Sequence, residues 1–294
     1  MGAVLRVLAA AVGVLPWRSL RLGGAALGWL AGTVLRIRRT HVLAAMRAAD
    51  VSPAASAAAS MYASLGTSAL EFLWMASRGL PECVAIEPRS EALWSQARAA
   101  GRGVVVAGSH TGNWDLAACA MARRGELLVV TKRLSVASLD RFWQDTRARL
   151  GLRLAPPQGA LAKGLAILRS GGAVAMMIDQ APGSVRHAVP TRFLGRPAWA
   201  DRSPAALAAL AGAPLVVAAC RRNRSGGHEL RVLDVRWPPP RPARAWIDDT
   251  TAAATRALDA FVRAHPGQWL WLHRRWKSLG VDPGLCASTL PSPC

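Results

Sequence analysis

Two residues five positions apart, His110 and Asp115, have the types needed for proton transfer, and they stand in the stretch SHTGNWD at 109–115. A compact apolar run, 104–107, precedes this stretch, and an alanine-rich apolar segment, 116–122, follows it. This order predicts a buried strand, a turn and a helix, which is the junction where open α/β sheets place their chemistry. A histidine and a carboxylate there can take a proton from a hydroxyl, so the pair predicts transfer of a group to that hydroxyl.

The spacing of this pair restricts its geometry. Five residues of a regular helix rotate about 500°, so His110 and Asp115 face apart unless His110 lies before the helix. Gly112 permits the turn that this requires, and Asn113 is a favourable N-cap. Asp115 then falls in the first helical turn, where the helix dipole favours its ionised form. We expect Asp115 to accept a hydrogen bond from one imidazole nitrogen and to leave the other as a base. The alternative is a helix cap beside a structural histidine.

Further side chains with chemical potential follow other apolar runs. Lys132 and Arg133 come after the run 127–131, where a cationic pair can hold a phosphate or polarise a carbonyl. Asp179 ends the run 173–178 and is expected either to orient a substrate or to cap a turn. The alternative for Lys132 and Arg133 is a solvated surface pair.

The cysteines indicate neither zinc nor covalent catalysis. The five cysteines are odd in number and show no CxxC or Cys/His metal spacing, so we expect a reducing compartment, no metal and no cofactor. Cys119, one turn beyond Asp115, is an acyl-accepting nucleophile only as a minor alternative to a buried core residue.

The composition indicates a basic, apolar protein. The chain has 294 residues, a net charge of +20, 52% hydrophobic residues and 18% charged residues, against about 25% charged residues in an ordinary soluble domain. Arginines neutralise either nucleic-acid phosphates or anionic headgroups. The apolar excess and the single tyrosine favour the membrane surface, so we expect no nucleic-acid partner.

The first 40 residues contain two uncharged apolar runs, 7–17 and 22–35, flanked by arginines. Each run is shorter than the roughly 20 residues that cross a bilayer. We interpret residues 1–40 as helices that insert in or lie on a membrane. The alternative is that these helices pack on the protein's own core.

The rest of the chain predicts an α/β domain over residues 41–280, followed by a flexible tail, 281–294. A helical region at 42–79 and a short helix at 92–100 come first. Short apolar runs then alternate with helical stretches, which predicts a mostly parallel sheet flanked by helices. The expected strands are 104–107, 127–131, 173–178, 214–219 and 230–235, and the expected helices are 114–122, 138–150, 159–169, 203–211 and 250–264.

An ordered set of motifs resembles a known family. His110-x4-Asp115 looks like the H-x4-D/E motif of glycerolipid-type acyltransferases, and residues 5 to 278 resemble the lipid A biosynthesis lauroyl/myristoyl acyltransferases. The related phosphatidylinositol mannoside acyltransferases share the pattern. The H-x4-D motif alone is weakly specific, whereas the ordered set is strong. The other matching blocks are Arg38-Arg39, 65–72, 131–133, 178–180, 193–195, 211–214 and HPGQWLWLHRRWK at 265–277.

The resemblance implies transfer of a fatty acyl chain from a thioester, on acyl carrier protein or CoA, to a hydroxyl of a membrane glycolipid. His110 would be the general base and Asp115 its partner. The backbone N–H groups near Gly112 and Asn113 are expected to stabilise the oxyanion. Arg133 lies closest to the basic residue of the family's second block.

The closing motif leaves two alternatives. Its tryptophans, Trp269 and Trp271, belong either at a lipid interface or in the core. Arg274 is a candidate for phosphate binding, and the same block also has a structural interpretation.

We expect a lipid A precursor as acceptor at the cytoplasmic face of the bacterial inner membrane. A phosphatidylinositol mannoside or another phospholipid or glycolipid is the alternative acceptor. A basic nucleic-acid-binding protein and a non-catalytic membrane protein are more distant alternatives. Acyl-chain length and the choice between carrier protein and CoA stay open.

Overall fold

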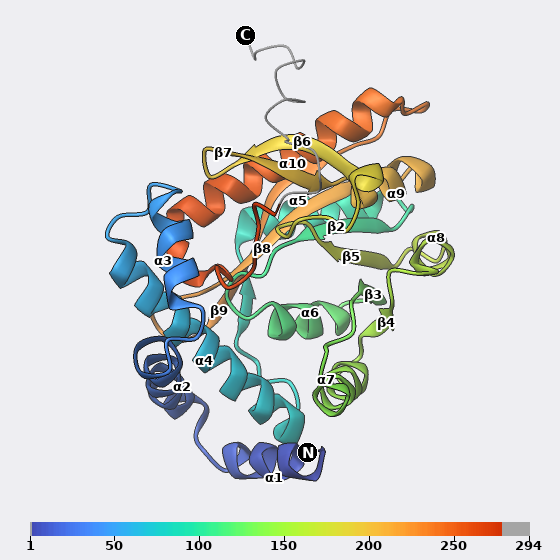
Figure 1. Ribbon diagram of the computed structural model, residues 1–294. Coiled ribbons are helices and arrows are strands. Elements are labelled where there is room, and N and C mark those ends of the chain that lie inside the picture. The colour runs from blue at the N-terminus through green and yellow to red at the C-terminus, as the bar shows by residue number, and fades with distance from the viewer. Residues whose placement is uncertain (1, 278–294) are drawn as a thin grey trace.

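A seven-stranded sheet forms the centre of the computed structural model, which describes residues 2–277 (Figure 1). Its strands are β1 (Val84–Ile86), β2 (Val104–Gly108), β3 (Leu127–Val130), β4 (Arg153–Ala155), β5 (Ala173–Met177), β8 (Leu215–Arg222) and β9 (His228–Arg236). The strand order is β1-β9-β8-β2-β5-β3-β4, and among the described pairs of this sheet β8 and β9 are antiparallel whereas the others are parallel. The predicted mostly parallel sheet is confirmed.

Helices cover both faces of this sheet. They are α3 (Arg39–Arg47), α4 (Ala54–Arg78), α5 (Pro88–Ala99), α6 (Trp114–Ala122), α7 (Ala137–Arg149), α8 (Ala160–Arg169), α9 (Ser203–Ala211) and α10 (Arg244–Ala264), with single turns at Val185–His187 (η3) and Pro266–Gln268 (η4). Figure 1 shows α9 and α10 on one side of the sheet and α6 and α7 on the other. Strands covered on both faces lose the alternation of apolar and polar residues, which is why they read as continuous apolar runs in the sequence.

An antiparallel hairpin stands outside the main sheet, and the sequence did not predict it. Its strands are β6 (Ala188–Phe193) and β7 (Arg196–Asp201). The turn between them holds Leu194 at φ 50° and Gly195 at φ 78°, the positive values of a tight hairpin turn. The backbone N–H of Leu194 donates to Asp259 of α10 at 2.7 Å, which ties the hairpin to that helix.

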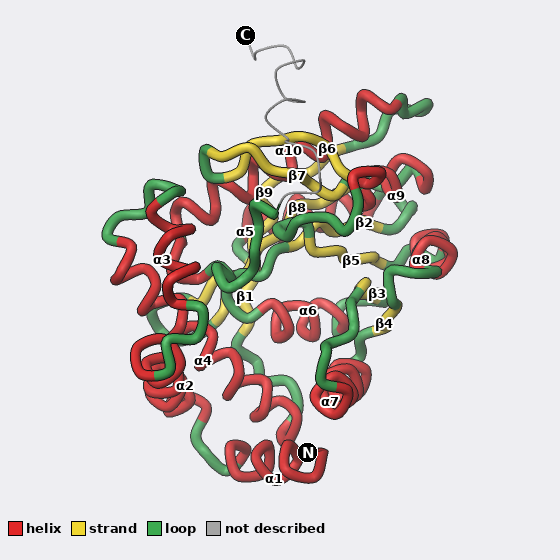
Figure 2. Tube along the Cα trace, in the orientation of Figure 1, coloured by secondary structure: helices red, strands yellow, loops and turns green. Residues whose placement is uncertain are grey.

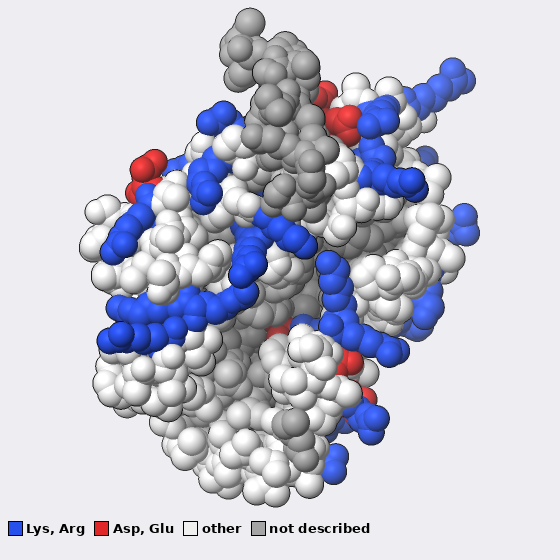
Figure 3. All heavy atoms as spheres, viewed as in Figure 1, with Lys and Arg blue, Asp and Glu red and all other residues white. Residues whose placement is uncertain are grey.

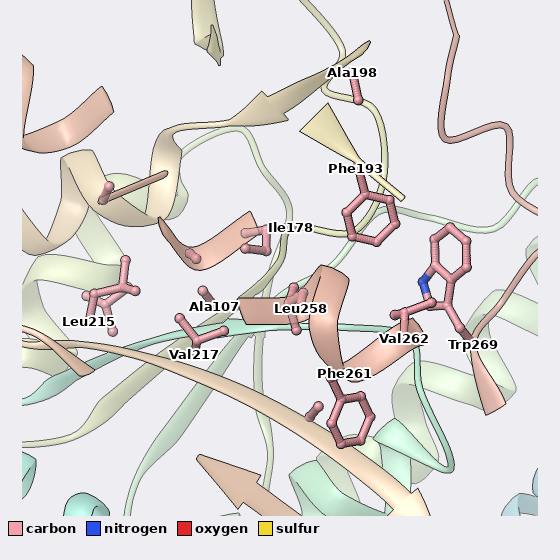
Figure 4. Packing of buried hydrophobic residues seen from close by; sticks show 14 of the residues in the cluster. Ala107, Ile178, Phe193, Ala198, Leu215, Val217, Leu258, Phe261, Val262 and Trp269 are labelled. Carbon is pink, nitrogen blue, oxygen red and sulfur yellow. The ribbon is translucent and has the colours of Figure 1, made fainter. Parts of the chain in front are cut away.

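The largest core cluster lies between the sheet, α10 and this hairpin (Figure 4). Val217 of the sheet and Leu258 and Val262 of α10 are fully or almost fully buried in it. Phe193, at the end of β6, meets Trp269 with ring centroids 5.3 Å apart. The hairpin therefore covers this core at the end where the strands of the main sheet end.

The N-terminal region forms two helices that pack on α4. They are α1 (Gly2–Gly13) and α2 (Leu20–Trp29), with a 3-10 turn at Trp17–Ser19 (η1) and a π-helical turn at Leu30–Val34 (η2). In residues 2–277 no single helix is long and apolar enough to cross a membrane; α1 and the stretch Trp17–Val34 reach that length only together, bent by 111°.

Glycines allow α2 and α4 to approach backbone to backbone. A Cβ atom added at Gly24 would lie 2.2 Å from the Cα of Thr67, and one at Gly28 would lie 2.3 Å from the carbonyl oxygen of Tyr62. On α4, a Cβ at Gly66 would lie 2.2 Å from the carbonyl oxygen of Gly24. Small residues at such spacing allow close helix crossings. One side of α2 thus packs on the core, as the alternative interpretation predicted.

The other side of this region exposes apolar side chains. Most of the exposed large apolar residues in the described chain lie between positions 4 and 37. They are Val4, Val7, Leu8, Val14, Leu15, Leu22, Leu27, Trp29, Leu30, Val34, Leu35 and Ile37. We call these twelve side chains the N-terminal apolar face. The predicted tail, 281–294, lies outside the described residues.

The crossing of α2 over α4 predicts opposite effects for two adjacent glycines. Gly24→Ala should lower the free energy of unfolding by about 1–3 kcal/mol, because its methyl group has no space beside Thr67. Gly23→Ala is the matched control, because its methyl group meets only the end of Leu70, and it should be neutral or slightly stabilising. Thermal and denaturant unfolding measure both, and equal stabilities would contradict the close crossing.

Candidate active site

The site lies where two neighbouring parallel strands end. β2 pairs with β5 from Val104↔Ala173 to Gly108↔Met177, so the residues that follow both strands emerge at one edge of the sheet. His110 follows β2 and Asp179 follows β5. Figure 2 shows several loops, drawn in green, in the middle of the view above α6. The predicted position of the reactive residues, at the carboxyl ends of the strands, is therefore confirmed.

Asp179 is a buried carboxylate that fixes His110 at two points. Its Oδ2 accepts from the backbone N–H of His110 at 2.8 Å, and its Oδ1 lies 2.9 Å from the imidazole Nδ1. The indole N–H of Trp269 also donates to Oδ2, at 2.8 Å. Because an ionised carboxylate only accepts hydrogen bonds, Nδ1 carries the proton and Nε2 carries the lone pair.

The charges of this pair raise the pKa of one group and lower that of the other. Burial alone lowers the pKa of His110, but the charge and hydrogen bond of Asp179 outweigh burial and raise it above its usual value. Burial alone raises the pKa of Asp179, whereas the charge of His110 and the three hydrogen bonds hold it below its usual value. Asp179 therefore stays ionised and acts as the orienting partner of a basic imidazole.

The outer side of the imidazole is open to a substrate. The side chain of His110 is 18% exposed, and within residues 2–277 no hydrogen bond engages Nε2. The ring of Trp114 lies edge-on, with its centroid 5.0 Å from that of His110. A base with one nitrogen fixed and the other free is the arrangement that general-base catalysis requires.

Asp115 does not take the role predicted for it. Its Oδ1 accepts from Arg147 of α7, with Nε at 2.7 Å and Nη2 at 2.5 Å. The bond that we expected from the imidazole to Asp115 goes to Asp179 instead, because β5 brings Asp179 alongside β2, whereas Asp115 lies in the first turn of α6 and binds Arg147 of α7. Asp115 contributes a smaller, through-space charge that raises the pKa of His110.

The turn after His110 is built as predicted, but the backbone N–H of Gly112 is already occupied. Gly112 has φ 57°, and a Cβ there would lie 2.7 Å from the carbonyl oxygen of Cys220. Asn113 caps α6, since its side chain accepts from the N–H of Leu116 at 3.0 Å.

The backbone N–H of Gly112 donates to the carbonyl of Gln268 at 2.9 Å. The expectation that this N–H binds an oxyanion is therefore wrong for this conformation, and Gly112 shapes the loop instead. An oxyanion contact of the Asn113 N–H stays a prediction.

The closing motif of the chain holds this turn in place. Thr111 bridges to Trp269, and the N–H of Leu270 donates to the carbonyl of His110 at 3.1 Å. Trp269 and Trp271 are each 1% exposed, so the core interpretation of these tryptophans is confirmed. The motif acts through backbone pairing and through the indole of Trp269.

A second buried carboxylate supports the cap of α6. Glu71 of α4 accepts from the side-chain amide of Asn113 at 2.8 Å and forms an ion pair with Arg222 of β8 at 2.7 Å. The Nε2 of His228 in β9 lies 3.2 Å from the same carboxylate. Burial alone raises the pKa of Glu71, but His228 and Arg222 hold it below its usual value. We call Glu71, Asn113, Arg222 and His228 the Glu71 network.

The remaining candidate cations differ in exposure. Lys132 and Arg133 are exposed in the loop after β3, at the same edge of the sheet as His110, and neither forms an ion pair within residues 2–277. Arg274 is exposed as well. Its neighbour Arg275 is 1% exposed, donates to the carbonyl of Trp199 and lies 5.0 Å from the ring centroid of Phe193, which is a structural role.

Figure 3 shows a hollow in the middle of this face with Lys and Arg side chains on both of its sides. In the same view, Figure 1 places α6 and the loops of the site behind this hollow. The surface around the site is therefore suited to an anionic donor or acceptor.

Neither metal binding nor a reactive thiol is indicated. In residues 2–277 no group of three His, Cys, Asp or Glu side chains is placed to hold a metal ion. Burial raises the pKa of the Cys119 thiol to about 12, so Cys119 is a buried core residue rather than a nucleophile.

Sequence reasoning missed Arg147 and Glu71, and it named Asp179 as a candidate without its contact to His110. Arg147 gave no signal, because it is one of many arginines on amphipathic helices. Glu71 stands within a motif block at 65–72, where a carboxylate on an otherwise apolar helix face was the available sign of a buried ion pair. The contact of Asp179 with His110 depends on β5 lying next to β2 in the sheet, an order that the sequence does not show.

The chain matches the family described as "Bacterial lipid A biosynthesis acyltransferase" over residues 3–278. It is also similar to proteins named phosphatidylinositol mannoside acyltransferase. Those of two Mycobacterium tuberculosis strains are 32% identical over 190 residues, which cover 61% of this chain and 56% of theirs. That of Mycolicibacterium smegmatis is 28% identical over 189 residues, which cover 63% of this chain and 60% of its own. The match thus spans little more than half the length of these relatives.

The geometry predicts how His110 titrates. In the intact protein the pKa of His110 should lie above the ordinary histidine value of about 6.5. Asp179→Asn should lower the pKa of His110 below that value. Burial still disfavours the charged imidazolium, whereas the attraction of the Asp179 carboxylate is lost. Asp115→Asn is the control, with a smaller decrease. NMR titration of labelled histidine measures all three, and an unchanged pKa in Asp179→Asn would contradict the pairing.

Proposed function

Because the chain belongs to the bacterial lipid A biosynthesis acyltransferase family, we propose that it moves a fatty acyl chain from a thioester to a hydroxyl of a membrane glycolipid. The observation that carries this proposal is the imidazole of His110, oriented at Nδ1 by buried Asp179 and free at Nε2. Such a base suits acyl transfer to a hydroxyl, since the acceptor itself is the nucleophile.

In the proposed reaction, Nε2 of His110 takes the proton of the acceptor hydroxyl as its oxygen attacks the thioester carbonyl. The C–O bond forms and a tetrahedral oxyanion results. The oxyanion then collapses, the C–S bond breaks, and the departing thiolate takes the proton back from the imidazolium. Because the base must start neutral, the raised pKa of His110 makes the rate fall as the pH drops below that pKa.

We assign Asp115 to the positioning of Arg147. Their ion pair joins α6 to α7 with little exposure, at 6% for the Asp115 side chain and 12% for that of Arg147. The charge of Arg147 reaches His110, whose pKa it lowers. A guanidinium whose charge reaches the base is suited to stabilise the oxyanion, a role that the N–H of Gly112, bound to the carbonyl of Gln268, does not fill.

The names of the similar proteins support a phosphatidylinositol mannoside as acceptor, and the family description supports a lipid A precursor. Both carry sugar hydroxyls on a phosphorylated lipid, which suits the basic surface around the site. We favour the mannoside, because its acyltransferases match the chain directly. Acyl-CoA and acyl carrier protein are both suitable donors for that surface, and the reaction needs no cofactor.

We further propose that the N-terminal apolar face lies on the cytoplasmic leaflet of the bacterial inner membrane. Exposed apolar side chains beside arginines are the features of a helix that binds at an interface. The acceptor lipid then reaches the site without leaving its leaflet. The net charge of +20 favours an anionic membrane surface over a neutral one.

The proposed base is tested by substitution. His110→Ala should lower the rate of acyl transfer by about 10²–10⁴, the typical contribution of a general base. His187→Ala, which removes an exposed histidine elsewhere, should leave the rate unchanged. The measurement is release of free thiol together with mass of the acylated lipid. A near-normal rate in folded His110→Ala would remove the assignment.

The acceptor is tested with purified lipids. We expect acylation of a phosphatidylinositol mannoside at a higher kcat/KM than that of a lipid A precursor, with each donor supplied in turn. Mass spectrometry of the product identifies both the acceptor and the added chain. Preference for the lipid A precursor would reverse our choice of acceptor, and transfer to neither would overturn the proposed glycolipid substrate.

A further inference from the structure

We propose that a pocket beside the N-terminal apolar face binds the phosphate of an anionic membrane phospholipid. The pocket has a volume of about 360 Å³ and lies between the turn after η2 and helix α3. Its polar lining consists of the side chains of Arg36, Arg39, Arg47, Thr33 and Thr40. We call it the arginine pocket. It is separate from His110 and Asp179, and the proposal rests on the membrane attachment proposed above.

The charges of the arginine pocket are uncompensated. In the described part of the chain, none of Arg36, Arg39 and Arg47 lies within 4.0 Å of a carboxylate. The lining contains guanidinium and hydroxyl groups, the apolar side chains of Leu43 and Ala44, and no acid. Phosphate matches such a set, because guanidinium groups donate paired hydrogen bonds to its oxygens and a threonine hydroxyl can donate one more.

The turn that forms the pocket is fixed by contacts from other elements. Arg36 has φ 50° and Arg38 has φ 53°, the left-handed region that non-glycine residues seldom occupy. The hydroxyl of Tyr62 donates to the carbonyl of Ile37, and Nη1 of Arg39 donates to that of Gly32 at 3.0 Å. The backbone of this turn and the side chain of Arg39 are therefore held in place by the protein's own contacts.

The surroundings of the pocket point to a lipid as the source of the phosphate. Exposed apolar side chains adjoin it in sequence, among them Val34 at 51%, Leu35 at 61% and Ile37 at 46% exposure. A bilayer that covers these side chains brings its headgroup phosphates to the level of the arginines. A soluble phosphate would find the same charges but would leave the apolar side chains in water.

The pocket also connects to the active site. Nη1 of Arg38 donates to the carbonyl of Leu272 at 2.7 Å, and this carbonyl lies three residues beyond Trp269, the indole partner of Asp179. A phosphate bound at the arginine pocket therefore fixes the orientation of His110 relative to the bilayer. The pocket thus serves as an attachment point that orients the active site toward the acceptor lipid.

The test compares two double variants of the full chain in flotation with vesicles. Arg36→Gln/Arg47→Gln removes two pocket charges that form no hydrogen bond within residues 2–277. Arg6→Gln/Arg18→Gln removes two exposed charges from the same region outside the pocket. The vesicles contain phosphatidylcholine alone or phosphatidylcholine with phosphatidylglycerol. Melting temperatures verify that both variants fold.

All three proteins should bind phosphatidylcholine vesicles equally, through the N-terminal apolar face. Phosphatidylglycerol should strengthen vesicle binding of the unaltered chain. The loss of this added affinity should be about tenfold larger in the pocket variant than in the control variant. Inorganic phosphate, with ionic strength matched by chloride, should compete with the lipid for the unaltered chain and not for the pocket variant.

Three outcomes separate the alternatives. Equal losses in the two variants would overturn the pocket, because the charges would then act diffusely. Binding of inorganic phosphate with no gain from phosphatidylglycerol would overturn the lipid source. The unaltered chain could also fail to bind phosphatidylcholine vesicles and still bind vesicles that contain phosphatidylglycerol. That outcome would support the pocket while contradicting attachment through the apolar face.

Discussion

The carboxylate of Asp179 is the interaction on which the site depends. It accepts the backbone and ring N–H groups of His110 and the indole N–H of Trp269, all within 2.9 Å. A buried carboxylate is costly unless charge and hydrogen bonds compensate it, so all three donors must be present together. The end of β2, the end of β5 and the closing motif after α10 are therefore positioned by one group.

This dependence explains why the closing motif is rich in tryptophan. Trp269 fills the core beside Phe193 with its ring and donates to Asp179 with its N–H. Tyrosine and tryptophan are the residues that combine a large apolar surface with a polar tip, and a buried indole N–H needs a partner. The same residue thus stabilises the fold and orients the base.

Periodicity predicted most of the α/β domain, because strands covered on both faces leave long apolar runs. It missed β1 and β4, which are only three residues long, and the β6–β7 hairpin, whose turn contains Leu194 in place of a usual turn residue.

The strand–turn–helix geometry around Gly112 and Asn113 was predictable, since it follows from local backbone preferences. The partner of His110 was not, because pairing between distant strand ends is set by sheet order. The spacing of Gly24, Gly28 and Gly32 was visible, but its meaning depends on the helix that crosses it.

The Glu71 network has a consequence for how such a chain can change over evolutionary time. Its four members come from α4, the cap of α6, β8 and β9, and each satisfies a buried polar group of another. Loss of Glu71 or Arg222 leaves an uncompensated charge in the interior, and loss of Asn113 or His228 removes a hydrogen bond from the Glu71 carboxylate, so the effects of substitutions at these positions do not add. An isolated change at one position is therefore penalised, whereas a joint replacement by a well-packed apolar set need not be. We therefore expect these four positions, which span half the chain, to change together rather than singly.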